Sequence, residues 1–211
     1  MKKRGILIGG GAFGREVLSW ANDRSADDRD VEFEHFLDAD ATVLDAFAEY
    51  SLGYLGDPET YVPVEGDIFL IAIGSPPMKD LLSKRLMAMG AQFTTVVHPS
   101  AVVSKAAEIG AGVIIGPQSY IATHSVLGDF SCVNSLSGIG HDANIGRCCT
   151  ISSQADIMGR VQLGERVFVG SGARILPNVK VQQGSKIGAG SIVVKNLGQD
   201  SSVFAQPARK I

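Results

Sequence analysis

The sequence predicts a parallel β-helix of six-residue repeats that follows a small α/β domain. Three observations support this fold class. Val, Ile or Leu opens each of seventeen consecutive hexads over residues 97–193. Gly stands directly after the opener in eight of them, and a small residue usually occupies the fifth place. Ahead of the repeat, a short apolar segment leads into a glycine-rich loop, a pattern typical of parallel α/β sheets.

A period of six fits neither a helix, with its apolar face every 3.6 residues, nor a plain strand, with its period of two. It indicates a flat strand and a corner, so that three sides close a coil of eighteen residues and stacked coils pair as parallel strands. The opener should fill the core, and we expect the Gly beside it to allow corner dihedrals that a Cβ would oppose. The apolar residues Ile114, Tyr120 and Phe168 should be exposed at corners and suit an interface.

Composition narrows the class of protein. The net charge of −3 and the lack of a Lys/Arg run beyond residues 2–4 argue against a nucleic-acid partner. No segment approaches the roughly 20 apolar residues of a membrane span, so we expect a soluble chain. The cysteines Cys132, Cys148 and Cys149 are odd in number, which predicts free thiols in a reducing cytoplasm.

The α/β domain begins with a short buried strand over residues 5–8. Residues 9–14 then satisfy the pattern G-x-G-x-x-G, and a helix is predicted over residues 15–22. Strand, glycine turn and helix N-terminus together form a phosphate cradle, because backbone N–H groups and the helix dipole favour an anion. We therefore assign Gly9, Gly11, Phe13 and Gly14 to ligand binding.

The next two strands lead to further candidate ligand-binding residues. Asp38 ends the second strand 24 residues after Gly14, where an acidic residue can meet a ribose hydroxyl. Capping of a turn explains this aspartate equally well. After a short third strand at residues 54–55, the fully apolar residues 68–73 form a central strand. This strand leads to Gly74 and Ser75, at the sheet edge where open α/β folds bind ligands.

A helix over residues 78–89 and a last strand over residues 93–97 complete the first domain. The segment His98-Pro99-Ser100-Ala101 then turns the chain into the prism. We therefore expect residues 1–95 to form a small βαβ domain and residues 96–211 to form the β-helix. The first domain is too short for a complete dinucleotide fold of two halves, and it suits a mononucleotide diphosphate better.

One histidine is a candidate general base. His141 occupies the third place of its hexad, a corner, and Asp142 follows it. A nearby carboxylate can hold one ring nitrogen protonated, leave the other free to accept a proton and stabilise the imidazolium. From the residues alone, a solvated corner histidine is the simpler interpretation.

The glycine-rich half-Rossmann domain, the His-Pro-Ser-Ala junction and the prism with its corner His–Asp pair resemble the sialic acid O-acetyltransferase-like family. Members are left-handed β-helix acyltransferases of hexapeptide repeats, and the handedness comes from this resemblance alone. Within the family, the chain is similar over essentially its whole length to nucleotide-sugar N-acetyltransferases of the bacillosamine and perosamine type. The resemblance implies acetyl-CoA, a nucleotide-linked amino sugar, and a cytoplasmic homotrimer with coenzyme A between neighbouring prisms.

The resemblance also implies roles for individual residues. His141 matches the general base, Asp142 its acidic companion and Asn134 an active-site asparagine. Gly159, one coil after His141, falls where a backbone N–H meets the thioester carbonyl. The positions assigned to coenzyme A binding are Thr150, Gly159, Gly188, Ala189, Gly190 and Pro207.

Two residues depart from the family pattern. Ala205 stands where Gly is usual, and Thr150 replaces a second histidine of some relatives. A threonine hydroxyl can donate a hydrogen bond but cannot take a proton at neutral pH. No metal is expected, because His124 and His141 leave the prism short of the usual three protein ligands of catalytic zinc.

Three functions fit these observations. The first is an acetyl-CoA-dependent N-acetyltransferase that acts on a nucleotide-linked amino-deoxy sugar by direct transfer. The second is a sugar O-acetyltransferase of the sialic acid type. The third is a scaffold that binds a nucleotide sugar without catalysis. The nucleotide, the sugar and the acyl group stay open at this point.

Overall fold

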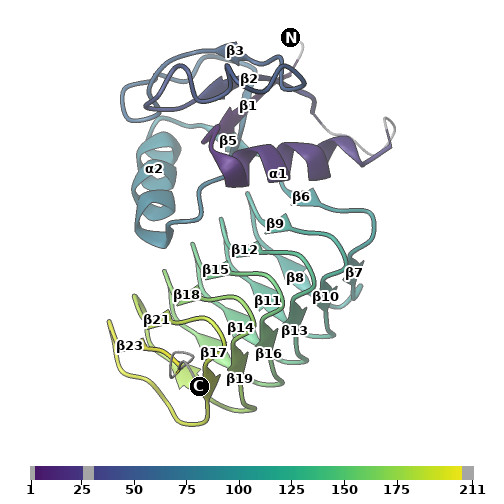
Figure 1. Cartoon of the computed structure of the whole chain (residues 1–211), viewed down its shortest axis with the longest axis vertical. Coiled ribbons are helices and arrows are strands. Elements are labelled where there is room, and N and C mark those ends of the chain that lie inside the picture. Colours follow the sequence, from purple (N-terminus) through teal and green to yellow (C-terminus); the bar gives the residue numbers. More distant parts are fainter. Residues whose placement is uncertain (1–2, 26–30, 206–211) are drawn as a thin grey trace, which may run out of the picture.

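A small α/β part sits on one end of a long three-sided coil in the computed structural model of the chain (Figure 1). The structure describes residues 3–25 and 31–205. The coil begins with β6 (Val96–Val97), two residues after the last strand of the α/β part, and its axis leads away from the α/β part.

Five parallel strands form the sheet of the α/β part, in the order β3-β2-β1-β4-β5. They are β1 (Arg4–Ile8), β2 (Phe33–Leu37), β3 (Gly53–Tyr54), β4 (Asp67–Ile71) and β5 (Gln92–Phe93). Helix α1 (Ala12–Asn22) lies between β1 and β2 in the chain, and α2 (Pro76–Ala88) lies between β4 and β5. Strand side chains alternate between faces, so Leu7 packs in the cluster with α1 and Ile6 in the cluster with α2. One helix therefore covers each face of the sheet.

Two of the expected elements differ in the structure. Helix α1 begins at Ala12 instead of residue 15, because the last residues of the glycine pattern already form its first turn. The single strand expected over residues 93–97 is two strands, since β5 pairs with β4 and β6 pairs with β9 of the coil. Between them, the N–H of Thr94 donates to the carbonyl of Phe69 at 3.0 Å, so the chain leaves one sheet before it joins the other.

Short strands of two residues line three flat faces of the coil. The seven-strand face contains β6, β9 (Ile114–Ile115), β12 (Cys132–Val133), β15 (Thr150–Ile151), β18 (Phe168–Val169), β21 (Lys186–Ile187) and β23 (Ser202–Val203). The six-strand face contains β7 (Val102–Val103), β10 (Tyr120–Ile121), β13 (Gly138–Ile139), β16 (Asp156–Ile157), β19 (Arg174–Ile175) and β22 (Ile192–Val193). The five-strand face contains β8 (Glu108–Ile109), β11 (Val126–Leu127), β14 (Asn144–Ile145), β17 (Gln162–Leu163) and β20 (Lys180–Val181).

The hexad pattern sets the register of the coil. Each opener is the second residue of its strand, and it pairs with the opener eighteen residues later, as Leu127 does with Ile145. From Ile115 to Val193 every opener is at most 5% exposed. The structure thus confirms that the openers form one continuous core along the prism.

The interpretation of the glycines beside the openers was wrong. Their backbone is not left-handed, so the corner dihedrals do not require glycine. The next coil does: a Cβ at Gly140 would lie 2.6 Å from the backbone N of Gly159, and a Cβ at Gly170 would lie 2.5 Å from that of Ala189. These glycines are therefore needed because successive coils approach closely. The left-handed residue stands two places later and is usually not glycine, as with Asp142 at φ 59°.

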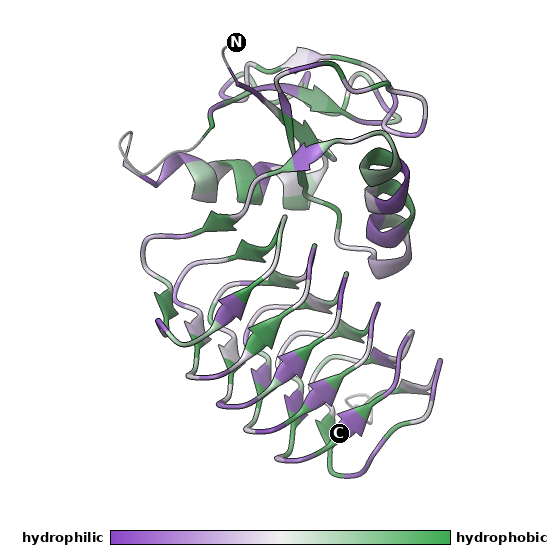
Figure 2. Ribbon diagram, turned by 180° about the vertical axis from the view of Figure 1, so that it is seen from behind, coloured by the Kyte–Doolittle hydropathy of each residue, from purple (hydrophilic) through white to green (hydrophobic). Residues whose placement is uncertain are grey.

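The α/β part rests on the first coils of the seven-strand face. Ile114 and Cys132 on that face are each 1% exposed and pack in one cluster with Val17 and Leu18 of α1. The expectation that Ile114 is exposed was therefore wrong, because α1 covers it. Figure 2 shows β6 and β9, the strands below α1, as hydrophobic along both residues. Tyr120, on the six-strand face, is exposed as expected.

We expect Gly170→Ala to destabilise the folded chain by about 1–3 kcal/mol, because the added methyl group has to displace the next coil. Gly138→Ala is the matched control, since the nearest atom to a Cβ there lies at 3.7 Å. Denaturant unfolding followed by circular dichroism measures both free energies of unfolding. An equal loss in the two variants would contradict the close-contact explanation.

Candidate functional site

The glycine loop opens into a cavity of about 370 Å³ in the α/β part. Six residues assigned to ligand binding from the sequence line it: Gly9, Gly11, Phe13, Gly14, Asp38 and Gly74. Ser75 is not among the lining residues and is the exposed residue that precedes α2. The cavity lies where β1, β2 and β4 end, so the sheet topology brings together residues far apart in sequence.

Gly9 and Gly14 have separate steric reasons, whereas Gly11 borders open space. Gly9 has φ +98°, a left-handed conformation that glycine adopts without strain. At Gly14 a Cβ would lie 1.9 Å from the carbonyl oxygen of Gly9, so α1 could not start so close to β1. At Gly11 a Cβ would meet no atom within 4 Å, and no side chain caps this end of α1. The free N–H groups of the first turn therefore stand beside open space in the cavity.

Asp38 makes the turn contacts that the sequence allowed, and its contact with a ribose stays a prediction. Its Oδ2 accepts a hydrogen bond from the N–H of Gly10 at 2.7 Å, and its Oδ1 accepts one from the N–H of Asp40 at 3.0 Å. The carboxylate thus fixes the glycine loop against the end of β2. It also lines the cavity, so it stands within reach of a ligand there.

The His141–Asp142 pair belongs to the coil and not to the α/β part that forms the cavity. It lies between β13 and β14, on the edge between the six-strand and five-strand faces. The Nδ1 of His141 is 2.7 Å from the Oδ2 of Asp142, and both side chains are about half exposed, at 53% and 45%. The hydrogen bond from His141 holds the pKa of Asp142 below its ordinary value. Arg160, one coil further on, approaches the same carboxylate at 4.0 Å.

Gly159 lies directly beside the ring of His141. A Cβ at this position would be 2.6 Å from the Nε2 of His141, so a larger residue would displace the imidazole from this orientation. Within the described part of the chain, neither this Nε2 nor the N–H of Gly159 has a hydrogen-bond partner. A proton acceptor and an N–H donor thus lie side by side on one exposed edge.

The other residues matched to the acyl-transfer site lie elsewhere on the prism. Asn134 follows β12, and Gly188, Ala189 and Gly190 follow β21, so all four lie on the edge between the seven-strand and six-strand faces. This edge is different from the one that carries His141. Pro207 lies outside the described residues.

Thr150 occupies a third location. It is 3% exposed on the seven-strand face, and its hydroxyl donates to the carbonyl of Gly74 at 2.9 Å. The side chain therefore links the coil to the cavity loop, and its contact with coenzyme A stays a prediction.

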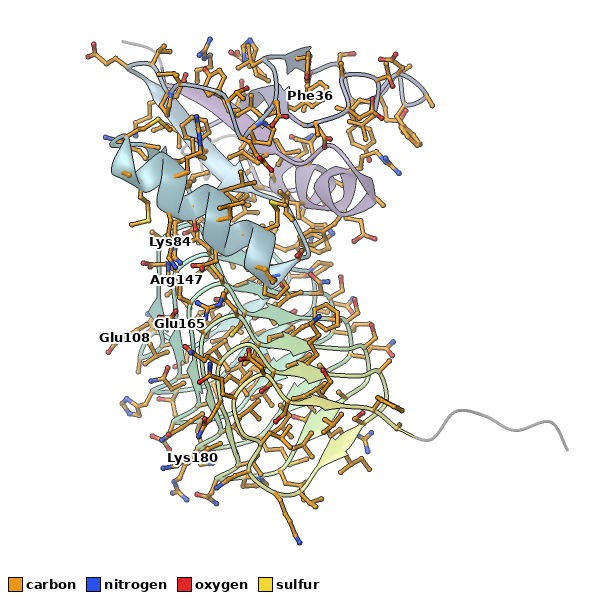
Figure 3. All side chains as sticks on the ribbon, turned by 90° about the vertical axis from the view of Figure 1, so that its left-hand side faces the viewer. Phe36, Lys84, Glu108, Arg147, Glu165 and Lys180 are labelled. Carbon is orange, nitrogen blue, oxygen red and sulfur yellow. The ribbon has the colours of Figure 1, made fainter. Side chains whose placement is uncertain are left out.

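Sequence reasoning missed an ion-pair cluster that fastens α2 to the coil. Asp80 pairs with Arg147, with Arg166 at 3.5 Å and with Lys84 at 2.8 Å. Burial alone would raise the pKa of Asp80, but Lys84 and Arg147 hold it below its ordinary value. Figure 3 shows Lys84 and Arg147 where α2 meets the coil. Asp80 and Lys84 are four residues apart on α2, whereas no motif marks Arg147 and Arg166, which only the packing of α2 against the coil brings to Asp80.

A buried lysine accompanies this cluster. Lys79 is 1% exposed, and its Nζ donates to the carbonyl of Cys149 at 2.8 Å. Burial lowers the pKa of Lys79.

The described ranges contain no group of three or more His, Cys, Asp or Glu side chains that could hold a metal ion. In the same ranges, neither helix has the length and apolar character needed to cross a bilayer.

The repeat and the closed coil define the fold class of the protein. The chain is a left-handed parallel β-helix built from hexapeptide repeats. No family model matches the sequence. Individual curated proteins and solved structures are nevertheless similar to it.

The chain is 31% identical over 117 residues to UDP-N-acetylbacillosamine N-acetyltransferase of Bacillus subtilis (strain 168). The matched segment covers 54% of this chain and 51% of that protein. It is 29% identical over 111 residues to GDP-perosamine N-acetyltransferase of Escherichia coli O157:H7, covering 53% of this chain and 50% of that protein. The chain thus matches about half the length of these curated relatives.

The solved structure of PerB from Caulobacter crescentus, in complex with CoA and GDP-perosamine, matches with a TM-score of 0.83 and 28% identity. This match covers 97% of this chain and 95% of PerB. Bacillosamine and perosamine N-acetyltransferases are therefore homologues of the chain, as the sequence resemblance predicted.

We expect Asp80→Asn to destabilise the chain by about 3 kcal/mol, because Arg147 and Arg166 lose their partly buried carboxylate. Glu165→Gln is the control, since this more exposed carboxylate also pairs with Arg166, and its loss should cost less than about 1 kcal/mol. Denaturant unfolding at neutral pH compares the two variants.

The loss of stability in Asp80→Asn should depend on pH, and the sign of this dependence follows from the pKa of Asp80. The pKa of Asp80 is lower in the folded chain than in the unfolded chain, where it is about 3.9. Its stabilising effect is therefore complete above that value and is lost as the pH falls through the folded-state pKa. Unfolding curves of the wild type and Asp80→Asn should converge in acid, and a constant difference across the acid range would contradict this assignment.

Proposed function

We propose that the chain is an acetyl-CoA-dependent N-acetyltransferase that acts on the amino group of a nucleotide-linked amino-deoxy sugar. One observation carries the proposal: the His141–Asp142 pair and Gly159 form a base and an N–H donor on an edge of the coil. The glycine-loop cavity of the same chain has the lining of a nucleotide site. The homologues are N-acetyltransferases of nucleotide amino sugars, and PerB binds CoA and GDP-perosamine.

In the proposed reaction, the sugar amine attacks the thioester carbonyl of acetyl-CoA directly. The new C–N bond forms first and gives a tetrahedral intermediate, from which the amine nitrogen loses a proton. The C–S bond then breaks, and coenzyme A leaves as the thiol after the protonated base returns that proton to the sulfur. His141 takes that proton at Nε2, because Asp142 orients the ring through Nδ1 and stabilises the imidazolium that results. The unpaired N–H of Gly159 stabilises the oxyanion of the tetrahedral intermediate.

The two ligands would use different parts of the chain. We propose that residues 1–95 form the nucleotide-sugar domain of half-Rossmann type, with the diphosphate at Gly11 and the first turn of α1. Residues 96–211 would bind acetyl-CoA and carry the catalytic pair. The buried free thiols of Cys132, Cys148 and Cys149 fit a reducing cytoplasm.

We further propose a homotrimer, because one chain separates the parts of the site. The α/β part covers the first coils of the seven-strand face, whereas His141 lies on the edge opposite that face. Packing the six-strand faces around a threefold axis would place the edge of His141 beside the neighbour's edge with Asn134 and Gly188. Three large side chains on the six-strand face, Val102, Tyr120 and Ile192, are more than half exposed and suit such contact.

We expect His141→Asn to lower turnover by about 10²–10⁴-fold, because Asn cannot accept the amine proton. The assay is thiol release from acetyl-CoA with UDP-, GDP- and dTDP-linked 4-amino-4,6-dideoxy sugars and their 4-hydroxy counterparts. Coenzyme A binding, measured by calorimetry, should stay unchanged. Turnover only on the hydroxy sugars would show an O-acetyltransferase, and absence of coenzyme A binding in the wild type would refute the enzyme.

Mixed assemblies test whether the site is shared between chains. A chain with His141→Asn keeps its cavity, and a chain with Gly11→Trp keeps its edge but has a blocked cavity. Co-expressed in equal amounts, the two inactive chains should regain about a quarter of wild-type activity, because a quarter of the shared sites combine two intact halves. Continued inactivity of the mixture would show that each chain acts on its own nucleotide sugar.

A further inference from the structure

The glycine-loop cavity has an unusual set of polar side chains. Among the described residues that line it, the only polar side chains are Asp38, Asp57 and Glu59. All three are carboxylates, which accept hydrogen bonds and donate none when ionised. No Lys, Arg, His, Asn, Gln, Ser or Thr belongs to this lining. Hydrogen-bond donors for a ligand therefore come from the backbone, and the side chains offer acceptors alone.

The available acceptors concentrate at one segment. Asp38 already receives the N–H groups of Gly10 and Asp40 on its two oxygens. The Oδ1 of Asp57 receives the N–H of Glu59 at 2.7 Å, which leaves its Oδ2 without a partner in the described ranges. The carboxylate of Glu59 has no hydrogen bond within those ranges either. The segment after β3 thus presents the two least committed carboxylates of the cavity.

This segment is held in place and is bordered by apolar surface. The guanidinium of Arg85 on α2 donates to the carbonyl of Tyr61 at 2.8 Å and approaches that of Pro58 at 3.4 Å. Pro58, Ile73 and Met78 contribute flat apolar surface to the same cavity. Such surface suits the faces of a planar nucleotide base, and the carboxylates can accept hydrogen bonds from donors on the edge of that base.

Electrostatics assigns the two ends of a bound nucleotide. A diphosphate is repelled by carboxylates, and the N–H groups of Gly11 and the first turn of α1 are the anion-binding end of the cavity. The base then belongs at the end formed by Asp57 and Glu59. A base at that end meets acceptors without any side-chain donor.

We infer that the cavity selects a guanine nucleotide, so that the sugar substrate is GDP-linked; this inference rests on the proposed function. Guanine presents the adjacent donors N1–H and N2–H, which a carboxylate can accept together. Uracil and thymine present a single N3–H between two carbonyl oxygens, which a carboxylate repels. Adenine and cytosine place a ring acceptor beside their amino donor. Charge-assisted pairing with Asp57 or Glu59 therefore favours guanine over the other four bases.

Calorimetric binding of GDP, UDP and dTDP to the full chain tests the inference. We expect GDP to bind at least about tenfold more tightly than UDP or dTDP, because hydrogen bonds to a charged group carry the difference. Glu59→Gln or Asp57→Asn should reduce GDP affinity by about 10- to 100-fold and leave UDP affinity nearly unchanged. Glu49→Gln is the matched control, since this exposed carboxylate does not line the cavity.

The outcomes separate this inference from the proposed reaction. Equal or tighter binding of UDP or dTDP, or GDP affinity that survives both carboxylate variants, overturns the guanine assignment. Rapid acetylation of a UDP- or dTDP-linked amino sugar also overturns it but leaves the N-acetyltransferase standing. Selective GDP binding without acetyl transfer to any amine would refute the reaction and keep the base selectivity.

Discussion

Close contact between successive coils is the constraint on which the rest of the structure depends. Parallel strands lie about 4.8 Å apart, so every place in a coil lies against its equivalent eighteen residues away. In the core, the aliphatic openers therefore stack on one another. Outside the core, one residue limits the size of its neighbour, because the imidazole of His141 fills the space that a Cβ at Gly159 on the next coil would need.

The same stacking gives each face and edge a separate role. The first coils of the seven-strand face are covered by the α/β part, which is fastened to the coil by Thr150 and by the pairs of Asp80 with Arg147 and Arg166. The opposite edge carries the catalytic candidates and stays exposed. A rigid coil thus keeps the glycine-loop cavity and the candidate base of one chain apart, which is why the proposed site needs a second chain.

Much of this could be predicted from the sequence, because strict periodicity constrains a solenoid more tightly than it constrains most folds. The openers, the glycine loop and the corner position of His141 followed from residue spacing. The spacing also contained a signal that was not used: seven residues separate Asn134 from His141, which carries the chain from one edge to the next. The pairing of Asp80 with Arg147 could not be predicted, since it depends on how α2 packs against the coil. The burial of Ile114 was missed for a similar reason, since it depends on how α1 packs against the coil.

The left-handed residue at each corner has an evolutionary consequence. Because corners accept ordinary residues such as Asp142 and Arg160, coils are interchangeable units of length. Loss or gain of eighteen residues ahead of His141 would slide the histidine along its own edge by about 4.8 Å, the spacing of parallel strands. Loss or gain of six would carry it to a neighbouring edge, away from any partner that evolved to meet it. Natural length variation in such chains should therefore come in whole coils, and the reach between nucleotide and base should change in discrete steps.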